Sequence, residues 1–460
     1  MPKNNNDLIT QPISTLMARI AIPSSVGFFF NTMYNVVDTY FSGLISTEAL
    51  AAMAISFPIF FIIMAMGNGL ATGTVALIGG ALGGNRHDDA ETLGAQGLSF
   101  GLVNSIVLLL VGWWATPYLF GFLGAEGIYL DIGVAYMTVI FQGSVFFMTV
   151  FMCNAILNSM GDTRTYRNFL IVGFLLNVGL DPWFIYGGLG LPAMGFKGVA
   201  LATVLVQVVG CFYIGYKVRR SGFFSSGFLN RLWPRPKVFL EIAQQGFPAA
   251  LNIATIGIGI FVIQFFVSRF GHAGVAAYGV AMRVEQIALL PTIGLNIAVL
   301  TLSAQNYGAK LPERVFEAVN KALKYGAVIL VVGGVLVIAF SRPLMAFFSD
   351  DPEVVAIGAT YLKIDALVFY AYAVLGVHVS ALQGSKKPMF AVWMGVYRQI
   401  IAPLVIYHML SQTLGYGLLG VWWGVLLVTW SAALIAMFYG RRLLRRRLGL
   451  EKSAPLASKG

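Results

Sequence analysis

The feature that most constrains this chain is a succession of long apolar segments. Runs such as SIVLLLVGWWA and AVILVVGGVLVIAF recur along nearly the whole of its 460 residues. They belong to segments of about 20 residues or more, long enough for a helix to cross a hydrocarbon core of about 30 Å. In lipid only helices and closed barrels satisfy all their backbone hydrogen bonds, and barrel strands alternate apolar with polar residues. These runs do not alternate, so the sequence predicts an all-α membrane protein.

Composition agrees with a chain that is solvated largely by lipid. Charged residues make up only 11% of it and hydrophobic residues 58%, whereas soluble proteins carry about 25% charged residues. Residues 1–12 are polar, and the first apolar segment continues far beyond a plausible cleavage site, so we expect a first span rather than a signal peptide. Polar breaks predict twelve spans, near residues 14–44, 48–80, 92–118, 127–159, 165–187, 195–219, 238–268, 273–305, 314–341, 353–383, 388–412 and 417–440.

The basic residues are distributed unevenly between the two sides of the membrane. If the N-terminus is inside, only Lys197, Arg269 and Arg342 fall outside. The positive-inside rule therefore places both termini in the cytoplasm, in a bacterial inner membrane. The net charge of +11 is thus a topology signal, and we expect the bilayer, not nucleic acid, as the large partner of this chain.

The chain repeats itself at an offset of 225 residues. The clearest matches are Pro23 with Pro248, Gly69 with Gly294, and Gly83 with Gly308. Six spans per half make the halves parallel repeats, related by an axis along the membrane normal. We therefore predict an N-lobe over residues 1–216, a cytoplasmic linker over 217–237, a C-lobe over 238–440 and a basic cytoplasmic tail over 441–460.

The sequence lacks the motifs of the enzyme classes that a membrane chain could contain. It has no Walker A loop, no HExxH, no CxxC and no prenyl-diphosphate acid motif. Cys153 and Cys211 lie in apolar segments without metal-ligand spacing, so we expect them only to pack. We predict a protein that is not an enzyme and that needs no cofactor.

Ionisable residues inside the spans are the strongest functional candidates, because each costs several kcal/mol to place there. Two acids, Asp38 and Asp181, lie in the outer half of the bilayer at similar depth in the N-lobe. The repeat pairs Asp38 with Ile263 at the offset of 225, and it pairs Asp181 with Ala402 in a later match, DPWFIY with APLVIY, at an offset of 221; neither partner carries a charge. This acid pair is therefore predicted to belong to the N-lobe alone.

Helical spacing gives both acids polar neighbours. Tyr34 and Asn35 precede Asp38 by four and three residues, and Asn177 precedes Asp181 by four, so each set shares a helix face. Oxygen ligands of this kind suit a proton or a small hard cation. The alternative is that both acids only accept hydrogen bonds between packed helices.

Two further acids, Glu285 and Asp365, lie in spans of the C-lobe. Arg283, Lys363 and Arg398 lie in spans of the same lobe. A structural ion pair and a role in transport are both open for these acids, because a buried charge is tolerated when it is paired.

Several motifs resemble the multidrug and toxic compound extrusion (MATE) family. They are PSSVGFFFNTMYNVVDTYFSG in the first span, GDT after the fourth, LNVGLDP in the fifth and GVALAT in the sixth, and the resemblance covers residues 14–440. The chain is similar to the DinF-like branch, whose members keep their acids in the N-lobe. The resemblance implies a V-shaped pair of bundles around a cavity. It also implies export of amphiphilic, mostly cationic organic compounds in exchange for H⁺ or Na⁺.

The resemblance also suggests roles for individual residues. It assigns a cation site, which would hold Na⁺ if that is the coupling ion, to Asp38, Asn177, Asp181 and Thr203. It assigns cavity-lining positions to Tyr34, Tyr136 and Asn154, to which the helix face of Asp38 adds Asn35, and it assigns a bend in the first helix to Pro23.

Other functions are less compatible with these features. A flippase or exporter of a lipid-linked or metabolite substrate is the main alternative, although flippases on this fold carry extra spans and more cationic cavities. A channel is disfavoured because two repeated lobes suit alternating access. We expect a monomer; the physiological substrate and the choice between H⁺ and Na⁺ stay open.

Overall fold

The computed structural model describes residues 7–188, 190–225 and 227–450. The part of the predicted basic tail beyond Leu450 lies outside these residues. The N-lobe helices are α1 (Asp7–Thr10), α2 (Ile13–Ile45), α3 (Thr47–Gly83), α4 (His87–Phe122), α5 (Gly127–Gln142), α6 (Ser144–Ser159), α7 (Arg164–Tyr186) and α8 (Phe196–Arg220). The linker contains α9 (Phe228–Arg231).

The C-lobe is built from α10 to α20, with short 3₁₀ and π-helical segments between them. In chain order they are α10 (Pro236–Val267), η1 (Ser268–Phe270), α11 (His272–Ala288), α12 (Leu290–Gly308), α13 (Pro312–Ala339), α14 (Ser341–Ala346), α15 (Pro352–Asp365), η2 (Ala366–Val368), α16 (Phe369–Gly384), α17 (Met389–Val396), η3 (Tyr397–Ile401), α18 (Ala402–His408), η4 (Met409–Thr413), α19 (Gly417–Ile435), η5 (Ala436–Gly440) and α20 (Arg441–Arg447).

The described residues form twelve helical segments that are long and apolar enough to span a membrane. Ten are single or continuous helical stretches, and two are helix pairs, α5 with α6 and α11 with α12, each bent by 46°. Short helices such as α1, α9 and α14 connect or flank them. The predicted fold class, an all-α membrane protein with twelve spans, is confirmed.

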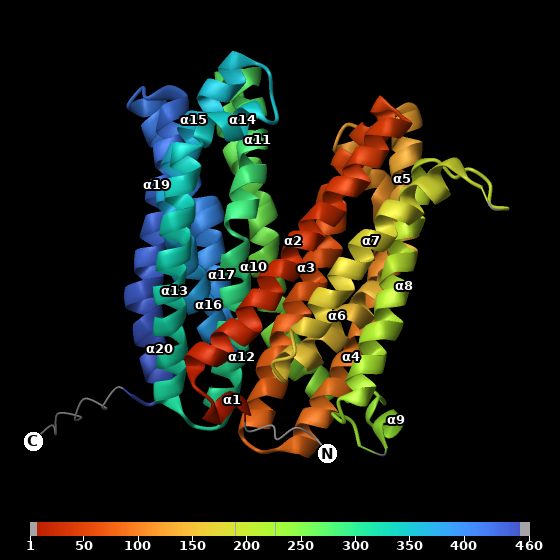
Figure 1. The fold of residues 1–460 in the computed structure, drawn as a ribbon, viewed down its shortest axis with the longest axis vertical. Coiled ribbons are helices and arrows are strands. Elements are labelled where there is room, and N and C mark those ends of the chain that lie inside the picture. Colours follow the sequence, from red (N-terminus) through yellow and green to blue (C-terminus); the bar gives the residue numbers. More distant parts are fainter. Residues whose placement is uncertain (1–6, 189, 226, 451–460) are drawn as a thin grey trace, which may run out of the picture.

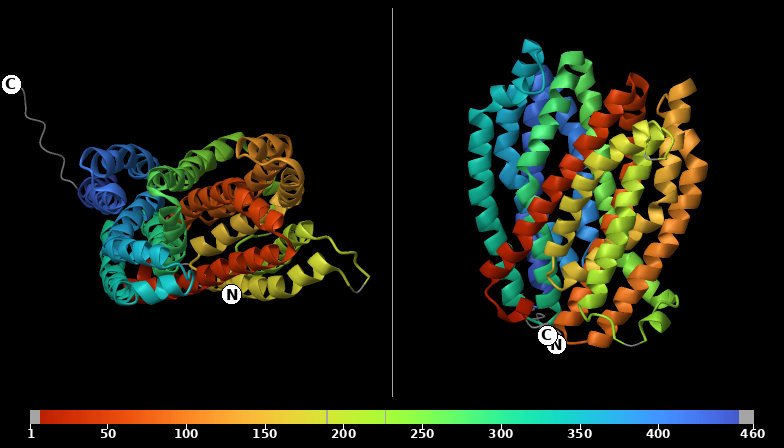
Figure 2. Two further views of the ribbon diagram at one scale, coloured as in Figure 1. Left: turned by 90° about the horizontal axis from the view of Figure 1, so that it is seen from above. Right: turned by 45° about the vertical axis from the view of Figure 1, so that its right-hand side comes forward.

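The helices gather into two bundles (Figure 1). The bundles meet at the end where α1 and α20 lie, which we call the terminal end, and diverge toward the opposite, far end. Views from above and from the side show the same two groups lying next to each other (Figure 2). Each bundle has its own apolar core, drawn from residues between Ala49 and Ile242 in one and between Ile263 and Val428 in the other.

The first helix of each half begins in the opposite lobe. The start of α2, with Met17 and Ile20, is buried in a cluster with α12, α13 and α16 of the C-lobe. The start of α10 does the reverse, because Ile242 belongs to the core of the N-lobe. Met17 and Ile242 are separated by the repeat offset of 225. The lobes are therefore joined by two exchanged helix ends, a feature that the predicted lobe boundaries did not contain.

Glycines bring the two lobes into backbone contact. A Cβ atom at Gly69 of α3 would collide with the backbone of Ala250 on α10. At the repeat-related positions, a Cβ atom at Gly294 of α12 would collide with the side chain of Ser25 on α2. Both contacts require glycine because only hydrogen leaves room for such close approach.

A second pair of contacts lies nearer the terminal end and follows the same symmetry. A Cβ atom at Gly83 would overlap the carbonyl group of Gln305, and one at Gly308 would overlap the carbonyl group of Gly80. The repeat offset of 225 relates Gly83 to Gly308 and Gly80 to Gln305, so it converts one contact into the other. The interface between the lobes is therefore a pseudo-two-fold one, in which the same surface of each half is used twice.

The linker is fastened to the N-lobe by one buried glutamine. The side-chain nitrogen of Gln96 on α4 donates to the carbonyl oxygens of Arg231, at 2.5 Å, and Trp233, at 2.8 Å. Its side-chain oxygen accepts a hydrogen bond of 2.7 Å from the backbone N–H of Arg235. One side chain thus satisfies three backbone groups that would otherwise lack partners.

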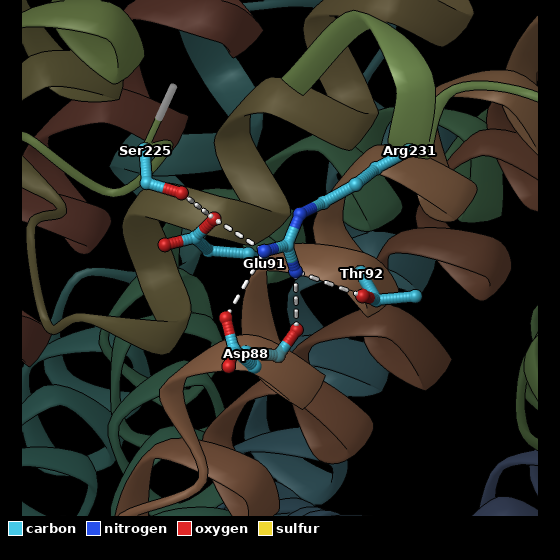
Figure 3. A network of polar contacts seen from close by, with 5 residues as sticks. All are labelled: Asp88, Glu91, Thr92, Ser225 and Arg231. Atoms are coloured by element: carbon cyan, nitrogen blue, oxygen red, sulfur yellow. Dashed lines mark hydrogen bonds and ion pairs between the residues drawn. The ribbon is translucent and has the colours of Figure 1, made fainter. Parts of the chain in front are cut away.

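Charged contacts reinforce this attachment (Figure 3). The guanidinium of Arg231 lies 3.0 Å from a carboxylate oxygen of Asp88 and 3.5 Å from one of Glu91, and it also donates to Thr92. The Ser225 hydroxyl donates to Glu91 at 2.7 Å. The linker therefore forms part of the N-lobe as far as the start of α10.

Candidate cation-binding site

Three helices of the N-lobe bring the predicted cation-site residues together. The side-chain nitrogen of Asn177 on α7 donates to Asp38 on α2 at 2.9 Å and to Asp181 at 3.0 Å. The Thr203 hydroxyl on α8 lies 3.4 Å from the second oxygen of Asp38, as a long hydrogen bond. All four residues are buried. Their role in ion binding stays a prediction, now with a defined geometry.

This acid pair has no counter-charge. None of the ion pairs within the described residues includes Asp38 or Asp181. Both carboxylates accept from the same nitrogen atom, so they cannot be further apart than the sum of those two distances. Like charges this close repel strongly where water is scarce. A proton or a small cation is therefore needed to make the site electrically stable.

Two oxygen atoms of the site are left without hydrogen-bond partners. Asn177 Oδ1 and Asp181 Oδ2 are buried and have no hydrogen-bond partner. Carboxylate and amide oxygens are the ligands that hard cations take. Among the described residues, no group of three or more histidine, cysteine, aspartate or glutamate side chains is placed to hold a metal ion. The amide and hydroxyl oxygens of Asn177 and Thr203 would thus have to complete a sodium site.

The predicted cavity residues divide into two groups. Tyr34 lies one helical turn before Asp38 on α2, and the ring of Tyr136 stacks on Phe196 at 4.6 Å. The Tyr34 hydroxyl and Asn154 Oδ1 are buried without hydrogen-bond partners, so both can bind a polar ligand. Asn35, by contrast, is exposed. Its place in the cavity lining stays a prediction.

Pro23 lies where α2 passes from the C-lobe to the N-lobe. The helix continues through it from Ile13 to Ile45 without a break. One turn earlier, the carbonyl oxygen of Ile20 accepts from the hydroxyls of Ser24, at 2.9 Å, and Thr163, at 3.0 Å. Because proline has no N–H, this part of α2 lacks one helical hydrogen bond. A bend at Pro23 remains a prediction.

The C-lobe acids do not form an ion pair within the described residues. Glu285 accepts a hydrogen bond of 2.9 Å from the hydroxyl of Tyr361. Asp365 is buried, and neither of its carboxylate oxygens has a hydrogen-bond partner. Arg283 and Lys363 are exposed. The structural ion pair that was one of two open interpretations is therefore not formed here.

Aromatic residues surround these acids, and sequence reasoning missed them. Tyr361 packs edge-on against Trp422 at 4.7 Å, and the guanidinium of Arg398 lies 5.0 Å from the ring centre of Tyr372. The spacing rule that found Asn177 would also have singled out Tyr361, which precedes Asp365 by four residues. In the folded chain, however, its hydroxyl bonds to Glu285 instead.

The two halves that carry these acids also match one family model twice. The MatE model matches residues 23–183 and again residues 248–408. The chain belongs to the MatE family. The two matches start 225 residues apart, the offset found between the repeats. Asp38, Asn177 and Asp181 fall within the first match and Glu285 and Asp365 within the second, whereas Thr203 lies outside both.

Relatives of this MatE protein cover almost its whole length. Multidrug export protein MepA of Staphylococcus saprophyticus is 26% identical over 439 residues, which are 95% of each chain. The FAD transporter of Shewanella oneidensis is 25% identical over 408 residues, or 87% of this chain and 89% of that one.

Solved structures show that the fold extends over the whole chain. A MOP superfamily transporter from Pyrococcus furiosus superposes with a TM-score of 0.91 at 24% identity, over 98% of this chain and 100% of that one. A multidrug resistance MATE family transporter in an outward-facing conformation also superposes with a TM-score of 0.91. It is 23% identical, and the superposition covers 97% of this chain and 99% of that one. The MATE fold implied by the motifs is confirmed; the DinF-like branch stays a prediction.

Proposed function

We propose that this protein is a cation-coupled antiporter that exports amphiphilic, mostly cationic organic compounds. The observation that carries the proposal is the buried pair of Asp38 and Asp181, which Asn177 joins and which has no ion-pair partner in the part of the chain that the structure describes. A proton or Na⁺ can neutralise this pair, and so can an organic cation. The relationship to multidrug export protein MepA supports the same function.

The orientation follows from the basic residues. Arg269 and Arg342 lie on η1 and α14, and α14 is at the far end of the bundle. We place the far end outside and both termini in the cytoplasm, in a bacterial inner membrane. With the lobes in contact at the terminal end and apart at the far end, the described conformation is outward-facing. It would take up the coupling ion from outside.

Exchange then arises from competition for one site. When H⁺ or Na⁺ binds Asp38 and Asp181, the charge that attracts a cationic compound is removed and the compound leaves. Thermodynamic linkage requires the compound to weaken ion binding by the same factor, typically about 5- to 150-fold between coupled sites. Inward flow of the ion thereby drives the compound outward.

A second candidate function is the export of an anionic metabolite, which the relationship to an FAD transporter favours. A phosphate-bearing substrate would need basic groups in the transport path. Arg398 on η3 of the C-lobe is such a group. The N-lobe acids repel an anion, so the cationic compound is the better match to this lobe.

Transport by purified protein in liposomes distinguishes these functions. Vesicles loaded with a fluorescent organic cation are energised first with a proton gradient and then with a sodium gradient. We expect efflux that depends on one gradient and that FAD does not inhibit. Efflux without either gradient, or gradient-driven movement of FAD but not of the cation, would refute the proposal.

A further inference from the structure

A basic groove lies at the terminal end of the C-lobe, far from the acid pair. It has a volume of about 730 Å³ and lies between α13 and α20. Its lining residues are Glu313, Phe316, Glu317, Asn320, Lys321, Lys324, Arg441, Arg445 and Leu450. A neighbouring hollow of about 660 Å³ shares Arg441 and Arg445 with it and adds Met437, Phe438 and Arg442.

Among the described residues, the groove lining carries more positive than negative charge, since Glu313 and Glu317 face four basic side chains. Glu317 is paired with Lys321 at 2.8 Å. Within the described residues, no ion pair includes Lys324, Arg441 or Arg445. These three cations line the same groove between α13 and α20. An anion with several oxygen atoms could contact all three at once.

Arg441 of α20 contacts α13 across the groove. One terminal nitrogen of its guanidinium donates to Asn320 at 3.1 Å, and the group lies 5.9 Å from the ring centre of Phe316. Its Nε atom is buried and has no hydrogen-bond partner. Because Nε has almost no accessible surface, a ligand in the groove would contact the terminal nitrogen atoms of Arg441 instead.

The groove opens onto a surface that faces the hydrocarbon core. Val328 and Val332, one and two turns from Lys324 on α13, are exposed, and so is Phe438, next to the groove on η5. In a twelve-span membrane protein such apolar side chains contact acyl chains. Positive charge at the membrane edge thus adjoins an apolar surface that continues into the bilayer.

We propose that this groove binds the headgroup of an anionic phospholipid, with the acyl chains along the exposed faces of α13 and η5. The phosphate oxygens accept from Lys324, Arg441 and Arg445, because basic residues at the membrane edge attract anionic headgroups. A zwitterionic lipid fits less well because its own cation opposes this charge. The bound lipid would join the cytoplasmic ends of the ninth and twelfth spans.

Thermal unfolding of the full chain in detergent tests this site. Phosphatidylglycerol, phosphatidylcholine and inorganic phosphate are titrated separately into the wild type and into the double variant Lys324→Gln/Arg445→Gln. We expect phosphatidylglycerol alone to raise the wild-type melting temperature. We expect the double variant to need a lipid concentration higher by roughly tenfold or more for the same shift. The matched control is Arg219→Gln/Arg220→Gln at the end of α8, which should respond as the wild type does.

Three outcomes would overturn the proposal. These are an equal shift with phosphatidylcholine, a shift reproduced by inorganic phosphate, and an unchanged response of the double variant. If the double variant does not fold, the single variant Arg445→Gln replaces it, because that side chain is exposed. Native mass spectrometry then compares retained phosphatidylglycerol between Arg445→Gln and the wild type, and equal retention would overturn the proposal.

Discussion

Asn177 holds the acid pair together, since its single side-chain nitrogen donates to both Asp38 and Asp181. Its own oxygen and one oxygen of Asp181 remain without partners. Protein groups that need no ligand are rarely left in this state, because buried polar atoms are almost always hydrogen-bonded. At the residue scale, these unpaired oxygen atoms support the proposal that a proton or a small cation binds here.

Asp38→Asn should abolish export of organic cations while leaving the amount of folded protein unchanged. The amide keeps the shape of the carboxylate but removes the charge that a proton or cation must neutralise. The measurement is efflux from energised vesicles, normalised to protein. The matched control is Asp131→Asn, which removes an exposed carboxylate on α5. Export at the wild-type rate by Asp38→Asn would contradict the proposed role.

Thr203→Val should have a much smaller effect. The hydroxyl lies 3.4 Å from Asp38, which is long for a hydrogen bond to an oxygen acceptor. We expect an apparent affinity for the coupling ion that is weaker by about fivefold, corresponding to about 1 kcal/mol, with full export at saturating ion. The half-saturating ion concentration for export measures this. A loss as complete as that expected for Asp38→Asn would show that Thr203 is an essential ligand.

The residues of this site differ in how far the sequence alone could predict them. Asp38 and Asp181 were predictable because charges in apolar segments are costly, and Asn177 followed from its spacing. Thr203 carries no such signal, since threonines are common in spans, and only the resemblance pointed to it. Spacing also pointed to Tyr34 and Asn35 as neighbours of Asp38; Tyr34 is half-buried and Asn35 exposed, and their cavity-lining roles stay predictions. Only the packing decides which of them faces the acid.

Helix boundaries followed the sequence closely, because the length of an apolar segment is set by the thickness of the membrane. The internal geometry of the spans could not be predicted from the sequence. The span predicted over 388–412 contains two π-helical segments, Tyr397–Ile401 and Met409–Thr413. Such segments depend on which carbonyl each N–H reaches in the packed bundle, and apolar periodicity does not report this.

The attachment of the linker was also invisible in the sequence, where Gln96 is one polar residue near a helix start. Gln96→Leu should release residues 231–235 from α4, because three hydrogen bonds are lost together. Each is worth about 1 kcal/mol, so cleavage of the linker by trypsin should accelerate roughly tenfold or more. Ser225→Ala, which loses one bond to Glu91, is the control. Equal cleavage rates in Gln96→Leu and the wild type would show that the glutamine does not anchor the linker.

On the scale of the whole molecule, the repeat offset identified the glycines of the interface but not their partners. Gly83 and Gly308 were recognised as a repeated pair, and the structure shows that both lie at the contact between the lobes. Sequence similarity between the halves cannot show which surfaces face each other. The exchanged starts of α2 and α10 were missed for the same reason, since each packs in the lobe to which it does not belong in sequence.

Gly83→Ala and Gly308→Ala should each disfavour contact between the lobes at the terminal end. In both variants the added methyl group overlaps a backbone carbonyl of the other lobe. Because the two contacts are related by the pseudo-two-fold axis, both variants should lower the population of molecules whose lobes touch at the terminal end. Spin labels at the exposed positions His87 and Lys310 report the distance between the lobes.

The matched control for these variants is Gly333→Ala on α13, where a Cβ atom meets nothing within 4 Å. Labels in this control should report the wild-type distance distribution. If Gly83→Ala and Gly308→Ala also give that distribution, the glycine contacts do not determine which end of the molecule is closed.

Competition between the coupling ion and the exported compound at the N-lobe acids is tested most directly by the affinity for a fluorescent organic cation. That affinity is measured across pH, and across Na⁺ concentration at fixed pH, in the wild type and in Asp38→Asn. We predict that wild-type affinity falls as H⁺ or Na⁺ increases, by about 5- to 150-fold at saturation, and that Asp38→Asn binds weakly and independently of both ions. Affinity that stays constant in both wild-type titrations would contradict the competition mechanism.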